Sequence, residues 1–135
     1  MLEHLRILVV DDEPDLCEIV RRVLTRAGAE VVTASGLSGA ERVCAEHPKA
    51  IDLAITDLKL NEGSGVQVAE AVRAACPDAL IMFMSGLPYF DAAVIELGPD
   101  ASVIAKPFRA TELIDTVQQA LIRSGGIPPE ADPEG

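Results

Sequence analysis

Five short apolar runs, each bounded by turn-forming residues, restrict the fold of this chain more than any other feature of its sequence. Three of them are almost continuous in valine, isoleucine, leucine and methionine, which is typical of strands covered on both faces of a sheet. The predicted strands are Arg6–Val10, Glu30–Ala34, Ile51–Thr56, Leu80–Met84 and Ser102–Ala105. The segments between them carry a helical repeat.

The first of these segments places apolar residues from Leu16 through Ile19 to Ala27 at the spacing of an amphipathic helix. Pro14 suits the first turn of that helix and Gly28 its end. Similar spacing predicts helices around residues 40–44, 66–72 and 113–121, and a shorter one over 89–97. The alternation predicts an α/β fold, a doubly wound five-stranded parallel sheet with helices on both faces.

Composition excludes several classes of protein. The chain has 135 residues, 49% of them hydrophobic, which suits one domain with a real core. It carries a net charge of −11, which would repel a phosphate backbone and argues against direct nucleic-acid binding. No apolar run approaches the ~20 residues of a membrane span, and the N-terminus carries no export signal, so we expect a cytoplasmic protein without membrane insertion.

Polar residues follow the apolar runs. Asp11 and Asp12 come after the first strand, Asp57 after the third, Ser85 after the fourth and Lys106 after the fifth. Ligands of parallel sheets bind beyond the carboxyl ends of the strands. We therefore expect these five side chains to converge on one crevice.

Adjacent carboxylates repel one another unless a cation lies between them. Mg²⁺ (or Mn²⁺) prefers oxygen ligands, takes one or two carboxylates and accepts phosphate oxygens. Lys106 would supply a positive charge for phosphate and Ser85 a hydrogen-bond donor. A carboxylate can itself be the nucleophile of phosphoryl transfer. Our candidate is Asp57, which we expect to lie between the acidic pair Asp11–Asp12 and the pair Ser85–Lys106.

Each residue also has a simpler reading. The run Asp11–Asp12–Glu13 could cap the N-terminus of the following helix, and we expect this role chiefly for Glu13. Asp57 could begin a turn, Ser85–Gly86 could be an ordinary turn, and Lys106 could be a surface lysine. It is the ordered set at separate strand ends that favours a functional site.

With these pieces assembled, the chain resembles the receiver domains of two-component response regulators. The matching segments are "ILVVDDEP", "LAITDLKLNEGSG", "IMFMSG" and "IAKPF", in the family's order and with similar gaps. The resemblance covers roughly residues 5–123 and implies a flavodoxin-like sheet of order 2-1-3-4-5. We predict a receiver domain over residues 1–123, followed by a flexible acidic tail rich in proline and glycine over 124–135.

The resemblance also implies a role for each site residue. Asp57 would accept a phosphoryl group from a phosphohistidine of a sensor histidine kinase or a histidine phosphotransfer protein. Asp12 and Asp57 would bind Mg²⁺ directly, Asp11 through water, and Lys59 through its backbone carbonyl. Lys106 would pair with Asp57 or its phosphate, Ser85 would bond the phosphoryl oxygen, and the bond before Pro107 is often cis.

Two residues depart from the family's pattern. Asn61 stands where proline is usual, which predicts a less stiff loop after Asp57. Val103 replaces the aromatic switch residue and cannot exchange exposed and buried ring positions, so the signal would be smaller or differently routed.

Three functions compete. The first is a phosphorylation-dependent switch, with at most slow self-dephosphorylation, that acts on a downstream protein; homodimers are common among such domains. The second is an Mg²⁺-dependent phosphatase with an aspartyl nucleophile, although "DD" here replaces the DxD motif of haloacid-dehalogenase-like enzymes. The third is a pseudo-receiver that serves only as a docking module.

Overall fold

The sheet has the predicted architecture. The computed structural model describes residues 2–86 and 102–123. All five strands are parallel and lie in the order β2-β1-β3-β4-β5, so β3 is central. The strands are β1 (Arg6–Val10), β2 (Glu30–Ala34), β3 (Leu53–Asp57), β4 (Leu80–Ser85) and β5 (Ser102–Ala105).

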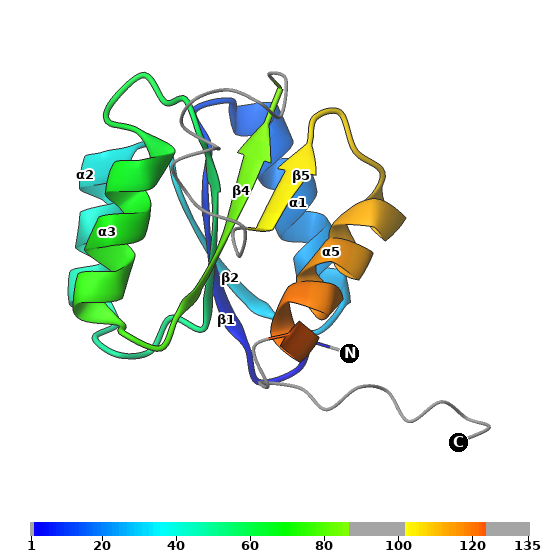
Figure 1. Cartoon of the computed structure of the whole chain (residues 1–135), viewed down its shortest axis with the longest axis horizontal. Helices are drawn as coiled ribbons and strands as arrows, with labels where there is room; N and C mark the ends of the chain where they lie inside the picture. Colours follow the sequence, from blue (N-terminus) through cyan, green and yellow to red (C-terminus); the bar gives the residue numbers. More distant parts are fainter. Residues whose placement is uncertain (1, 87–101, 124–135) are drawn as a thin grey trace.

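Helices cover both faces of this sheet. Figure 1 shows α2 and α3 on one face and α1 and α5 on the other. The helices are α1 (Pro14–Arg26), α2 (Leu37–Glu46), α3 (Gly65–Ala75) and α5 (Ala110–Arg123). The doubly wound α/β fold is therefore confirmed, while the predicted helix over 89–97 and the tail 124–135 lie outside the described residues.

Two strands have bounds that differ from the prediction, and the differences at their carboxyl ends affect the site. β3 begins at Leu53 instead of Ile51 and includes Asp57, and β4 includes Ser85. The hydrogen-bond ladder continues past these residues, because the Leu58 amide donates to the Met84 carbonyl at 3.0 Å and the Lys106 amide to the Ser85 carbonyl at 2.8 Å. The backbones of Asp57 and Ser85 are therefore held by the sheet.

The core consists of two apolar layers, one on each face of the sheet. The layer under α2 and α3 includes Leu8, Val10, Ala54, Val68, Val72 and Phe83. The layer under α1 and α5 includes Ile7, Val9, Leu24, Ile55, Met82, Met84 and Leu113. Successive residues of a strand alternate between these layers, as the pleat requires. Burial on both faces explains the nearly continuous apolar runs.

Helix α1 begins at Pro14 as expected, and Gly28 follows it with a φ of +107° that glycine adopts without strain. Its predicted apolar stripe is too wide, however. Val20 and Leu24 are fully buried, but Ile19 is 56% exposed. The buried face is therefore narrower than the apolar pattern.

The last helix is tied to the last strand. The Arg123 guanidinium at the end of α5 donates a hydrogen bond of 2.8 Å to the Ser102 hydroxyl at the start of β5.

Within the described part of the chain, none of the helices has the length and apolar character that crossing a bilayer requires.

Candidate phosphoacceptor and metal site

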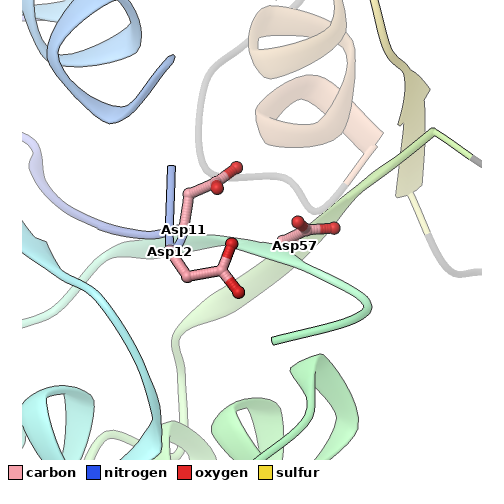
Figure 2. Close-up of side chains that lie close together, drawn as sticks. All are labelled: Asp11, Asp12 and Asp57. Carbon is pink, nitrogen blue, oxygen red and sulfur yellow. The ribbon is translucent and has the colours of Figure 1, made fainter. Parts of the chain in front are cut away.

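Three aspartates meet at the carboxyl edge of the sheet. Asp11 and Asp12 directly follow β1, and Asp57 ends the neighbouring strand β3. Figure 2 shows their carboxylates gathered at this edge. One oxygen from each lies within 4.8 Å of the other two. The structure therefore confirms the predicted convergence of the three acids.

Lys106 joins two of these acids. Its ammonium group donates hydrogen bonds of 2.9 Å to Asp11 Oδ2 and 2.9 Å to Asp57 Oδ2. The side chain of Asp11 is 0% exposed, that of Asp57 13% and that of Lys106 14%. The ion pairs are therefore largely shielded from water and form one connected group.

Burial and charge act in opposite directions on this group. Burial raises the pKa of Asp57, the hydrogen bond from Lys106 lowers it and the charge of Asp11 raises it, so that the pKa lies above its ordinary value. Burial lowers the pKa of Lys106, but its bonds to Asp11 and Asp57 outweigh this and hold that pKa above its ordinary value. The ammonium form of Lys106 is thus stabilised, whereas Asp57 carries its negative charge at a cost.

The predicted side-chain cap on α1 is not formed by Glu13. Glu13 is the N-cap residue, but no capping hydrogen bond to its side chain is present among the described residues. Instead the Glu13 amide donates to Asp11 Oδ1 at 2.8 Å, and the Glu13 carboxylate lies 3.6 Å from Lys106 Nζ. The capping prediction for Glu13 is therefore wrong, and the Asp11 side chain instead closes a short turn just before the helix.

Ser85 and Lys106 come from neighbouring strands, β4 and the end of β5. Ser85 is 2% exposed and pairs in register with Ala105, the residue before Lys106. The bond between Lys106 and Pro107 is cis. Lys59 is close enough for a backbone hydrogen bond that lowers the Asp57 pKa. The phosphoryl contact of Ser85 and the metal contact of the Lys59 carbonyl stay predictions.

The two residues that depart from the family's pattern, Val103 and Asn61, lie in different parts of the structure. Val103 on β5 is half-buried and packs against the core layer under α2 and α3. Asn61 lies on the loop between β3 and α3, where its backbone amide donates to Asp12 Oδ2 at 2.8 Å. A proline at this position would have no N–H to donate.

Sequence reasoning missed two of these contacts. The bond from Lys106 to Asp11 crosses two intervening strands, and only the length of the lysine side chain hints at it. The bond from Asn61 to Asp12 uses a backbone amide, which nearly every residue type supplies. The absence of proline at this position was the one available signal.

The donor set fits a hard divalent cation. Clustered carboxylate oxygens are what Mg²⁺ and Mn²⁺ prefer, and Mg²⁺ seldom uses more than one or two carboxylates. Asp11 already accepts from Lys106 and from the Glu13 amide. Asp57 also accepts from Lys106, and Asp12 accepts from the Asn61 amide, so hydrogen bonds hold all three carboxylates in place.

Comparison with known proteins is consistent with this geometry. Residues 7–118 match the family model of the response regulator receiver domain. The chain is 34% identical over 119 residues to the transcriptional regulatory protein KdpE of Mycobacterium tuberculosis, covering 87% of this chain and 51% of KdpE. It is 32% identical over 124 residues to the response regulator receiver protein CpdR of Brucella abortus, covering 87% of this chain and 97% of CpdR.

Solved structures give the same result. A response regulator receiver protein from Sinorhizobium medicae superposes with a TM-score of 0.78 at 32% identity, over 92% of this chain and 99% of the other. A receiver domain protein from Clostridium thermocellum gives a TM-score of 0.77 at 28% identity, over 90% and 97% of the two chains. The chain spans about half the length of KdpE but nearly all of CpdR.

Proposed function

Because this chain belongs to the response regulator receiver domains, which are phosphoacceptor signalling modules, we propose that Asp57 is its phosphoacceptor. The single observation that carries the assignment is the position of Asp57. It ends the central strand, bonds Lys106 at 2.9 Å and lies within 4.8 Å of oxygens of Asp11 and Asp12. Among the described residues, this is the cluster of acids that could hold a metal ion.

The chemistry follows from these groups. A carboxylate oxygen of Asp57 attacks the phosphorus of a phosphohistidine, the P–N bond breaks, and the released imidazole takes up a proton. Lys106 offsets the charge of the phosphoryl oxygens, and Ser85 donates a hydrogen bond to one of them. A bound Mg²⁺ or Mn²⁺ supplies further charge stabilisation to the transferring group.

In this proposal Asp12 and Asp57 hold the cation directly, the Lys59 carbonyl completes the protein's share, and Asp11 acts through water. Support comes from the hydrogen bonds described above, which already engage both oxygens of Asp11. Asp11 would thus orient Lys106 while a cation occupies the space beside Asp12.

Membership of the family implies a histidine kinase as the source of the phosphoryl group. We further propose that transfer is direct or through a histidine phosphotransfer protein, that it takes place in the cytoplasm, and that the phosphorylated domain acts on a downstream protein. The net charge of −11 argues against nucleic acid as the direct target. We place the domain at residues 1–123, and leave homodimer formation as an expectation from the family.

To test phosphorylation, the protein is incubated with acetyl phosphate and Mg²⁺, and intact mass spectrometry detects any added phosphoryl group. We expect wild type to gain one phosphoryl group and Asp57→Asn to gain none. Asp78→Asn is the matched control, because Asp78 is an exposed aspartate before β4, at the opposite edge of the sheet. It should be modified like wild type.

Each competing function gives a different result. Rapid multiple turnover of phosphate esters would instead support the phosphatase. A wild-type chain that is modified by no donor and binds no Mg²⁺ would support the docking module. Modification of Asp57→Asn at the wild-type level would remove Asp57 from its assigned role.

A further inference from the structure

The loop between β3 and α3 contacts the metal site on one side. The Asn61 amide donates to Asp12 Oδ2 at 2.8 Å, as described above. Asp12 is half-buried and one of its oxygens lies within 4.8 Å of oxygens of two other carboxylates. A charged carboxylate accepts a stronger hydrogen bond than a neutral group. The amide therefore restrains the acid that like-charge repulsion would otherwise push outward.

The next residue of the loop contacts the start of helix α2. The Leu37 amide donates to the Glu62 carbonyl at 3.0 Å, and the Ser38 hydroxyl donates to Glu62 Oε1 at 2.9 Å. The Ser38 amide also donates to Glu62 Oε1, at 3.3 Å. The N-cap residue of α2, Gly36, has no side chain to offer, so Glu62 supplies acceptors to the unpaired amides of that helix end.

The two segments are also tightly packed. A Cβ added at Gly36 would lie 2.7 Å from Glu62 Oε1 and 3.1 Å from the Glu62 carbonyl oxygen. A Cβ added at Gly63 would lie 2.6 Å from Leu37 Cβ, and Gly63 has a φ of +83°. The loop therefore has little room to move independently of the first turn of α2.

We propose that Asn61 and Glu62 couple cation binding at Asp12 to the N-terminus of α2. Asn61 acts as a positioning residue through its backbone amide, and Glu62 carries the effect to Leu37 and Ser38. The coupling rests on the proposed function, because it takes the cation to be held by Asp12.

The direction of the coupling follows from charge. Without a cation, repulsion among Asp11, Asp12 and Asp57 works against the bond between Asp12 and Asn61. A bound cation removes that repulsion and holds Asp12 in place, which favours the bond. Coupling between two equilibria is reciprocal, so the bond raises cation affinity by the same factor by which the cation favours the bond.

The consequence is a response on the α2 side of the molecule. α2 packs beside α3 on the face of the sheet shown in Figure 1. This route does not pass through Val103, the position at which an aromatic ring is usual in the family. The first turn of α2 would thus report occupancy of the site.

The test compares two substitutions at one position. Asn61→Pro removes the donating N–H, whereas Asn61→Ala removes the side chain and keeps the N–H. Mg²⁺ affinity is measured by calorimetry, and protection of the Leu37 and Ser38 amides by hydrogen exchange with and without saturating Mg²⁺. Far-UV circular dichroism checks that both variants fold.

We expect Asn61→Pro to bind Mg²⁺ about tenfold more weakly, the lower end of the range for a lost outer-shell partner. Mg²⁺ should raise the hydrogen-exchange protection of the Leu37 and Ser38 amides in wild type and in Asn61→Ala. By reciprocity this rise is at most as large as the change in Mg²⁺ affinity, about tenfold. Mg²⁺ should leave protection unchanged in Asn61→Pro. Equal affinities of the two variants, or an Mg²⁺ effect on α2 that persists in Asn61→Pro, would overturn the proposal.

A second pair of variants covers the case in which proline prevents folding. Glu62→Gln keeps an oxygen acceptor for Ser38, and Glu62→Ala removes it. Only Glu62→Ala should lose the Mg²⁺ effect on the Ser38 amide, and identical behaviour of both variants would contradict the coupling. A wild-type chain that binds Mg²⁺ and is phosphorylated while these variants match it would refute the coupling alone, whereas a wild-type chain that binds no Mg²⁺ would refute the proposed function as well.

Discussion

Replacement of Lys106 by methionine tests how the acidic site is held together. Lys106 is the cation that bonds Asp11 and Asp57, each at 2.9 Å. Methionine has a similar length and fills similar space, but it carries no charge and donates no hydrogen bond. In Lys106→Met two largely buried carboxylates would therefore face each other without a counter-charge.

The expected cost can be worked from the burial of the three side chains. Removal of one partner from a buried ion pair costs about 3–5 kcal/mol. Asp11 is 0% exposed, but Asp57 and Lys106 keep 13% and 14% exposure, so water can relieve part of that cost. We therefore expect the free energy of unfolding to fall by about 3 kcal/mol in metal-free buffer at pH 7. A domain of this size is stable by about 5–15 kcal/mol, so the variant should still fold.

The dependence on pH has a definite sign. Burial already raises the pKa of Asp57, and loss of Lys106 removes an interaction that lowers it. An acid with a raised pKa binds protons more tightly in the folded state, so its penalty grows as pH rises above the unfolded value of about 3.9. Urea unfolding of both proteins in EDTA should show a large difference at pH 7 that shrinks as pH falls toward 4.

A second substitution isolates the cause. In Lys106→Met/Asp57→Asn one of the two unpaired charges is gone, and part of the lost stability should return. Saturating Mg²⁺ should also narrow the gap to wild type, because the cation supplies positive charge. A Lys106→Met variant as stable as wild type in EDTA at pH 7, or a double variant less stable than the single one, would refute this account of the site.

Three further predictions concern neighbouring positions. Asp12→Asn keeps an acceptor for the Asn61 amide but removes a charge, so in EDTA the substitution should be neutral or stabilising by up to about 1 kcal/mol. In thermal unfolding, Mg²⁺ should stabilise this variant less than it stabilises wild type. A clear loss of stability in EDTA would contradict the repulsion argument. Asp57→Asn should be more stable than wild type in EDTA at neutral pH and lose this advantage near pH 4, because the raised pKa of Asp57 makes its charge costly in the folded state; parallel stability curves across that range would show that its charge costs nothing. Gly65→Ala should cost about 1–3 kcal/mol in urea unfolding, because its Cβ would approach Leu58 Cα at 2.9 Å, whereas Gly86→Ala, with its nearest contact at 4.0 Å, should match wild type; equal stability of the two variants would count against a close approach at Gly65.

The sheet was predictable because strand pattern and strand burial have the same cause. β1, β3 and β4 are buried on both faces, and their apolar runs are nearly continuous for that reason. The convergence of Asp11, Asp57 and Lys106 followed, because parallel strands bring their carboxyl ends to one edge.

Contacts that depend on backbone atoms or on one rotamer were not predictable. The Asn61 amide has no sequence signature beyond the absence of proline, since almost any other residue offers an N–H. Glu13 looked like a cap, yet its side chain accepts no hydrogen bond from the described helix, because whether an acid reaches a helix amide depends on its side-chain torsion angles. Ile19 fits the helical repeat but lies just outside the buried stripe, which the repeat alone cannot resolve.

The sequence distance between the charges of the site has a consequence for the order in which the molecule assembles. The two hydrogen-bonded ion pairs of Lys106, with Asp11 and Asp57, span 95 and 49 residues, so both acids are synthesised long before their counter-charge. A partly folded chain that lacks β5 holds three mutually repelling carboxylates without the Lys106 ammonium group between them. The domain would therefore be able to accept a phosphoryl group only once its last strand is in place. A domain that still lacks β5 would take no part in signalling.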